Sequence, residues 1–179
     1  MEIAIRSYVA GSHLLESDSR PWDAIVILDS NILETEFIGN HTRSHLFLRF
    51  DDVLTTTQGK RSPTVEDIGS AIHFSNGSNR LVVCCRAGQS RSVATAFSIA
   101  YHKRGANAAL ELLNPKRHSP NSLIIDLAST IIDDPMFATT FRDWQSTNSS
   151  IKLIDYVDEI ERELDVLESN GARDRIVQT

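Results

Sequence analysis

The stretch that decides the fold lies near the middle of the chain, where residues 80–92 read Arg-Leu-Val-Val-Cys-Cys-Arg-Ala-Gly-Gln-Ser-Arg-Ser. Its first part, Arg80–Cys84, is short and rich in apolar and β-branched residues, which is typical of a buried strand. The segment Ser90–Lys103 is rich in alanine and other apolar residues, so it predicts a packed helix, which Gly105 ends. We therefore expect residues 85–90 to form a loop between a buried strand and a helix.

Strands and helices alternate along the rest of the chain. Asp23–Asp29 and His45–Phe50 have the composition of strands, and the loose alternation of Ile3–Ala10 favours an edge strand. Further helices are expected at Thr64–Ser75, where Thr64 and Asp67 suggest a capping box, and at Ala106–Leu113, Pro120–Ile131 and Leu153–Leu167. Asp133–Ser150 is expected to be rich in loops. This order predicts a three-layer α/β/α fold with a central, mostly parallel sheet.

Length and composition limit the possible classes of protein. The chain has 179 residues, 41% of them hydrophobic, which suits one domain with a sizeable core. We expect a main domain over residues 1–145 and an amphipathic C-terminal helix, within residues 146–179, packed on it. The net charge of −6 argues against nucleic-acid or anionic-membrane partners. No apolar run reaches the roughly 18 residues that span a bilayer, and the N-terminus lacks the apolar core of a signal peptide.

The two cysteines are neighbours, Cys84 and Cys85. Two adjacent cysteines exclude a disulfide framework and a cysteine-rich zinc site, and they favour a reducing, cytoplasmic compartment. The six histidines are dispersed without the spacing of metal ligands. We therefore expect neither a metal nor a cofactor.

The loop after the first strand has the chemistry of an anion site. Backbone N–H groups at a helix N-terminus converge on one point, and the helix dipole favours negative charge there. Gly88 lets the loop turn, and Arg91 can clamp two phosphate oxygens with its planar fork. Cys85 at the rim is the candidate nucleophile, and the hydroxyl of Ser92 can donate to its sulfur. The candidate substrate-binding residues are Arg86, Ala87, Gly88, Gln89, Ser90 and Arg91.

The string resembles the phosphate-binding loop of cysteine-dependent protein tyrosine and dual-specificity phosphatases, whose pattern is His-Cys-five residues-Arg-Ser/Thr. Cys85 falls on the nucleophile, Arg91 on the phosphate-binding arginine and Ser92 on the hydroxyl. Phe50–Val53 looks like the aspartate-bearing segment of compact bacterial tyrosine-phosphatase-like proteins. Arg117–Asn121, which ends in Pro-Asn, is similar to an element of dual-specificity enzymes. The resemblance covers roughly residues 20–132. It implies the fold of these phosphatases and hydrolysis through a phosphocysteine.

The resemblance also implies a general acid about 30 residues before the nucleophile. Asp51 and Asp52 both lie at this distance. Asp52 is the predicted acid because the family's aspartate precedes an apolar residue, here Val53, whereas Asp51 is expected to be structural. Asp29, at the end of an earlier strand, is a weaker candidate.

Three further positions have two interpretations each. Lys60 and Arg61 follow the predicted acid and could attract a phosphorylated substrate, although a solvated charge pair is the commoner use. Asn121 could hydrogen-bond the phosphate-binding loop from behind, or could cap a helix. Cys84 stands where the family has histidine. It is interpreted as a buried strand residue, with a vicinal disulfide to Cys85 as the alternative.

The sequence thus predicts a phosphate monoester hydrolase that acts on phosphotyrosine, with phosphoserine or phosphothreonine as further substrates, in a protein or peptide. Two alternatives stay open. One is a catalytically weak pseudophosphatase that binds phosphorylated partners, for which Cys84 is the main support. The other is a phosphatase of a non-protein ester, such as an RNA 5′ end or a phosphoinositide, against which the net acidic charge weighs.

Overall fold

A computed structural model of the chain describes residues 1–32, 37–148 and 153–177. Its core is a sheet of four strands, β1 (Glu2–Arg6), β2 (Asp23–Leu28), β3 (Ser44–Arg49) and β4 (Arg80–Cys84). The strand order is β1-β4-β2-β3, and all the pairs are parallel. Because every residue of β2 and nearly every residue of β4 is buried, these two central strands have the continuous apolar sequences from which they were predicted.

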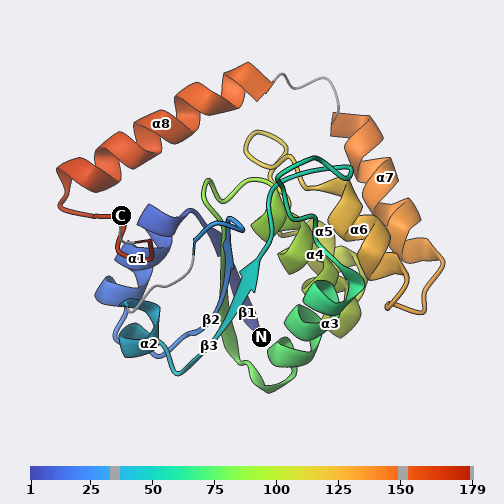
Figure 1. The fold of residues 1–179 in the computed structure, drawn as a ribbon, viewed down its shortest axis with the longest axis horizontal. Coiled ribbons are helices and arrows are strands. Elements are labelled where there is room, and N and C mark those ends of the chain that lie inside the picture. The colour runs from blue at the N-terminus through green and yellow to red at the C-terminus, as the bar shows by residue number, and fades with distance from the viewer. Residues whose placement is uncertain (33–36, 149–152, 178–179) are drawn as a thin grey trace.

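Helices cover both faces of the sheet (Figure 1). Their bounds are α1 (Tyr8–Ser17), α2 (Phe37–His41), α3 (Val65–Phe74), α4 (Arg91–Arg104), α5 (Ala106–Leu110), α6 (Ser122–Ser129), α7 (Met136–Asn148) and α8 (Leu153–Ser169). One apolar core lies between the sheet and α3–α7, and a second lies between the sheet and α1 and α2. The predicted three-layer α/β/α fold is confirmed. None of the described helices has the length and apolar character needed to cross a membrane.

Local sequence signals place the helices around the central loop. Thr64 caps α3 in the predicted capping box: its side chain accepts from the Asp67 N–H while the Asp67 carboxylate accepts from the Thr64 N–H. Gly105 ends α4 with a φ of +80°. Asn121 caps α6, because its side chain accepts from the N–H of Ile124.

Two sequence predictions of local structure need correction: the expected N-terminal edge strand is present but shorter, and a segment expected to be rich in loops contains a helix. The strand expected over Ile3–Ala10 ends at Arg6, and α1 follows, because the Ser7 hydroxyl accepts from the Ala10 N–H and caps a helix. The region expected to be rich in loops contains the thirteen-residue α7. Phe137 and Phe141 of α7 are buried against Phe97 of α4, and tertiary packing thus outweighs the threonines that lower the helix propensity of this segment.

The C-terminal part of the chain crosses the molecule from the α7 side back to α1 (Figure 1). In α8, Ile160 is buried and Glu163 forms an ion pair with Arg117; the side chains of Leu153 and Val157 lie outside the described residues. After α8, Ile176 is fully buried in the core beside α1, and the N–H of Arg175 donates to the Ser12 hydroxyl.

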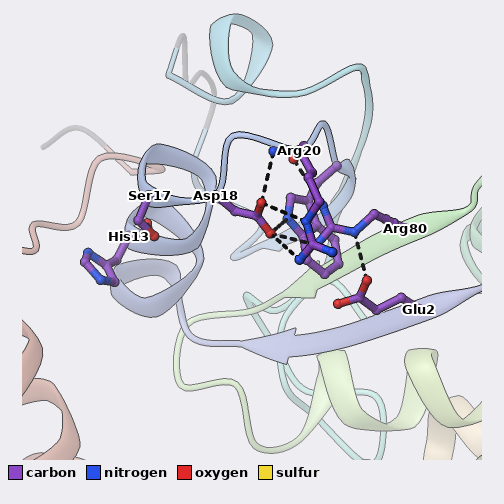
Figure 2. A network of polar contacts seen from close by, with 7 residues as sticks. Glu2, His13, Ser17, Asp18, Arg20 and Arg80 are labelled. Carbon is purple, nitrogen blue, oxygen red and sulfur yellow. Dashed lines mark hydrogen bonds and ion pairs between the residues drawn. The ribbon is translucent and has the colours of Figure 1, made fainter.

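A polar network joins the amino ends of the strands to the end of α1 (Figure 2). The Asp18 carboxylate accepts from Arg20 and from Arg80, and Arg80 also bonds Glu2. The guanidinium of Arg80 stacks 3.9 Å from the ring centroid of Trp22. Hydrogen bonds from Arg20 and Arg80 hold the pKa of Asp18 well below its usual range. This network fixes the end of the sheet opposite to the carboxyl ends of the strands.

Candidate active site

The central loop joins the carboxyl end of β4 to the N-terminus of α4. Gly88 at its turn has a φ of +70° and packs directly on the chain between β1 and α1. A Cβ atom at this position would lie 2.5 Å from the backbone N of Ser7 and 2.6 Å from the backbone carbon of Arg6. Glycine is required at Gly88 for two separate reasons, the backbone conformation and the close approach.

The Cys85 thiol lies at the base of this loop and is 2% exposed. Its sulfur is 3.1 Å from the hydroxyl oxygen of Ser92, and Ser92 is fully buried in the first turn of α4. Ser90 precedes α4 but makes no side-chain capping bond, so its hydroxyl does not occupy the N–H groups of the first helical turn. The thiol, the Ser92 hydroxyl and these N–H groups are thus all located where the loop enters the first turn of α4.

Arg91 is buried, and its guanidinium is held by the residues that directly follow β2 and β3. Nη1 donates to the backbone oxygen of Phe50 over 2.7 Å, and Nη2 forms an ion pair of 2.8 Å with the carboxylate of Asp29. Burial lowers the pKa of Arg91, but the nearby groups of Cys85 and Asp29 outweigh that effect and raise it. Nε is buried and has no hydrogen-bond partner among the described residues.

These groups line one cavity of about 310 Å³, a volume at the lower end of the usual range for ligand sites. The predicted residues Cys85, Arg86, Ala87, Gln89, Ser90, Arg91 and Asp52 all line it, together with Asp29, Asp51, Val53 and Lys60. Two predicted residues do not. Ser92 lies beneath the sulfur, and Gly88 supports the loop from the side of β1.

The two adjacent aspartates have different surroundings. Asp51 is 4% exposed and accepts from the N–H and hydroxyl of Ser30 and from the N–H of Arg61, with Lys60 Nζ 3.8 Å away. Burial would raise the pKa of Asp51, but these hydrogen bonds lower it below its ordinary value. Asp52 is exposed in the cavity wall, where its Oδ1 accepts from Ser90 and Asn121.

The segment before α6 supports the loop from behind. The N–H of Ser119 donates to the Gln89 carbonyl over 3.0 Å, and the N–H of Asn121 donates to the Ser90 carbonyl over 3.4 Å. Both interpretations of Asn121 therefore hold at once, since the same residue caps α6 and bonds the loop.

Lys60 and Arg61 have separate surroundings. Lys60 lines the cavity, whereas Arg61 turns away, donating to the carboxylate of Asp67 and to the backbone oxygen of Arg49. Arg61 is thus structural, and Lys60 is the cation of this pair that can meet a ligand.

Cys84 and Cys85 point to opposite faces of the sheet, as successive residues of a strand do. Cys84 is fully buried in the core beside α1, and Cys85 belongs to the core beside α4. A Cβ added to Gly11 would lie 2.5 Å from the Cys84 sulfur, so α1 packs closely on this thiol. Burial raises the pKa of Cys84. Cys84 is therefore a packing residue, and both cysteines are free thiols, so the vicinal disulfide is not formed.

The sequence did not predict the positions of Asp29 and Tyr8, two residues near Arg91. Asp29 was the weakest candidate acid, yet it forms an ion pair with Arg91; its signal was a carboxylate at the carboxyl end of a central strand. Tyr8 carries no sequence signal. It is buried in α1 and donates to the backbone oxygen of Ile27 over 2.6 Å; burial raises the pKa of its hydroxyl, and the Arg91 guanidinium opposes that effect.

No model of a protein family matches the sequence, and no curated protein matches it either. Solved structures that are similar in fold include Tk-PTP and PTPMT1. Tk-PTP in its active form has a TM-score of 0.50 at 13% identity, covering 74% of this chain and 92% of its own. PTPMT1 in complex with PI(5)P has a TM-score of 0.52 at 14% identity, covering 79% of this chain and 93% of its own.

The fold is that of the cysteine-dependent protein tyrosine and dual-specificity phosphatases, as the resemblance implied. The matches cover about three quarters of this chain and nine tenths of each of the two structures, so the likeness is one of the fold as a whole. The likeness to compact bacterial members stays a prediction.

Proposed function

We propose that this protein is a cysteine-dependent phosphate monoester hydrolase that acts on phosphotyrosine in proteins or peptides, with dual specificity as the broader form. One observation carries the proposal: Cys85, Arg91 and Asp52 line a single cavity, and the Ser92 hydroxyl lies 3.1 Å from the sulfur. The two unpaired thiols suit a reducing compartment, for which we propose the cytoplasm.

In the first step the Cys85 thiolate attacks phosphorus. The sulfur–phosphorus bond forms, the bond to the ester oxygen breaks, and Asp52 gives its proton to that oxygen. Arg91 and the loop N–H groups bind the phosphoryl oxygens, whose charge they stabilise in the transition state. Arg91 Nε, which is buried and unpaired among the described residues, is the donor best suited to meet one of them.

In the second step a water molecule attacks the phosphocysteine. The ionised Asp52 takes a proton from this water, the sulfur–phosphorus bond breaks, and inorganic phosphate leaves. The Ser92 hydroxyl donates to the departing thiolate, so it stabilises the same species that begins the cycle.

The test is hydrolysis of 4-nitrophenyl phosphate by the reduced, folded protein. Cys85→Ser is expected to lower kcat by at least about 10³-fold, because an alcohol is a far weaker nucleophile than a thiolate at neutral pH. Cys84→Ala, which changes the neighbouring thiol on the opposite face, is the matched control and should keep its activity. A folded wild type without Cys85-dependent hydrolysis would refute the enzyme and favour a pseudophosphatase.

The choice of acid has its own test. Asp52→Asn should lower kcat/KM for a poor leaving group, such as phenol, by about 10²-fold or more, and should affect 4-nitrophenol much less. Full activity of Asp52→Asn on phenyl phosphate would exclude Asp52 as the acid.

A phosphoinositide is the second candidate substrate. The similar PTPMT1 structure is a complex with PI(5)P, and in this chain Lys60 and the loop residue Arg86 line the cavity in addition to Arg91. The headgroup of this lipid carries a phosphodiester besides the phosphate monoester, so it presents more anionic oxygens to these cations than a single phosphotyrosine does. Comparing kcat/KM for a tyrosine-phosphorylated peptide and a short-chain PI(5)P separates the two substrates. If Lys60→Ala lowers kcat/KM for PI(5)P but not for the peptide, the result would favour the phosphoinositide as substrate.

A further inference from the structure

Both donors on Asp52 reach the same carboxylate oxygen. Asn121 Nδ2 lies 2.7 Å from Oδ1, and Ser90 Oγ lies 2.8 Å from the same atom. The three residues come from three elements, namely the segment after β3, the start of α6 and the phosphate-binding loop. We propose that Asn121 is a positioning residue that decides which oxygen of Asp52 carries the proton. This inference rests on the proposed function, in which Asp52 is the general acid.

The amide of Asn121 has one orientation. Its Oδ1 accepts from the N–H of Ile124 over 3.2 Å, and its Nδ2 donates to the Val53 carbonyl over 3.2 Å as well as to Asp52. A flipped amide would place an oxygen against a carboxylate and a carbonyl, and would turn its NH₂ toward another N–H. The side chain is 2% exposed, so water has little access to replace these bonds. Asn121 is therefore an obligatory donor to Asp52.

Ser90 differs from Asn121 because its hydroxyl can either donate or accept by rotation. It can therefore adapt to either protonation state of Asp52, whereas Asn121 cannot. With Asn121 donating to Oδ1, a proton on that oxygen would compete with the amide hydrogen, so the acidic proton belongs on Oδ2. Among the described residues no hydrogen bond or ion pair involves Oδ2. Asn121 thereby leaves Oδ2 as the oxygen able to give a proton to a leaving group.

The helix cap makes this arrangement rigid. Asn121 is the N-cap of α6, so the residue that orients the acid is held by a helix that packs against α3 and α4. Its backbone N–H also donates to the Ser90 carbonyl, which ties the acid to the phosphate-binding loop. Asn121 and Asp52 are 69 residues apart, and only the tertiary structure brings them together.

The experiment compares two leaving groups in Asn121→Ser. Serine is as good a helix cap as asparagine, but its shorter side chain removes the amide donor. We expect kcat/KM for phenyl phosphate to fall at least 10-fold, and for 4-nitrophenyl phosphate to stay within about 3-fold, because only the poor leaving group needs the proton. The double variant Asn121→Ser/Asp52→Asn should have the same kcat/KM for phenyl phosphate as Asp52→Asn alone, since both changes act through one carboxylate.

Thr64→Ala is the matched control. It removes the side chain that caps α3, and this side chain bonds no residue of the cavity wall. It should lower stability by about 1 kcal/mol without changing the ratio between the two substrates. Equal losses on both substrates in Asn121→Ser, or losses that add to those of Asp52→Asn, would mean a merely structural role and would overturn the inference. A wild type without Cys85-dependent hydrolysis would instead overturn the proposed function, and the inference with it.

Discussion

Gly88→Ala tests how the loop is held in its catalytic shape. The positive φ of +70° costs an alanine about 1–2 kcal/mol. The new methyl group would also lie 2.5 Å from the backbone N of Ser7, whereas ordinary contact begins at 3.4 Å, so the loop or β1 must move by about 0.9 Å. The obstacle is backbone and cannot rotate away. With overpacking of about 1–3 kcal/mol added, we expect the free energy of unfolding to fall by about 2–5 kcal/mol.

The displacement of the loop should reduce activity more than the loss of folded protein alone would. A shift of about 1 Å in a group that positions substrate commonly costs about 10²-fold in rate, so we expect that loss in kcat/KM for 4-nitrophenyl phosphate. The assay is run at a temperature where urea unfolding shows the variant to be folded. Binding of vanadate, an oxyanion similar in shape to phosphate, should weaken in parallel.

Gly171→Ala separates strain from displacement. Gly171 has a φ of +90°, but a Cβ there would meet no atom within 4 Å, and the residue does not line the cavity. This variant should lose about 1–2 kcal/mol of stability and keep its activity. If Gly88→Ala retains kcat/KM within 3-fold of wild type, the close packing of the loop on Ser7 does not set its geometry.

The remaining predictions concern Asp51 and Cys84. Asp51→Asn should lower the free energy of unfolding by about 1–3 kcal/mol at pH 7. Because the pKa of the Asp51 carboxyl is depressed in the folded state, this difference should shrink as the pH falls below about 4. A constant difference in urea midpoint from pH 7 to pH 3 would contradict this prediction. Gly11→Ala should destabilise wild type but be tolerated in a Cys84→Ala background, with a coupling of about 1–3 kcal/mol, since the added Cβ meets the Cys84 sulfur; additive effects in thermal unfolding would argue against this contact. Cys84→His should destabilise the protein by at least about 1–3 kcal/mol and leave the pH–rate profile of the remaining activity unchanged, because the side chain faces α1 and not the cavity; a shifted profile would show that this position acts on Cys85.

Much of the fold could be predicted because its signals are local. The continuous apolar sequences of β2 and β4 reflect burial on both faces, and the capping residues Thr64 and Asn121 mark the starts of α3 and α6. The elements that were missed lack such signals. In α7 the anchors Phe137 and Phe141 stand among polar residues, and packing on another helix decides the conformation.

The sequence by itself determined the content of the site: a strand, a loop with Cys85, Gly88 and Arg91, and a helix whose first turn presents N–H groups. These follow from residue type and spacing within a dozen residues, where chain geometry leaves little choice.

Only the tertiary structure decided which partners surround each member of the two pairs of neighbours. The resemblance favoured Asp52 over Asp51 as the acid, but only the tertiary structure places Ser30 and Arg61 around Asp51, and places Asp52 beside Asn121 in the cavity wall. The same holds for Cys84, the last residue of β4, and Cys85, which directly follows it, because the two side chains lie in separate cores on opposite faces of the sheet. The physical reason is common to both pairs: adjacent residues share a composition, but their partners come from segments distant in the chain, and the partners set burial, hydrogen bonding and charge.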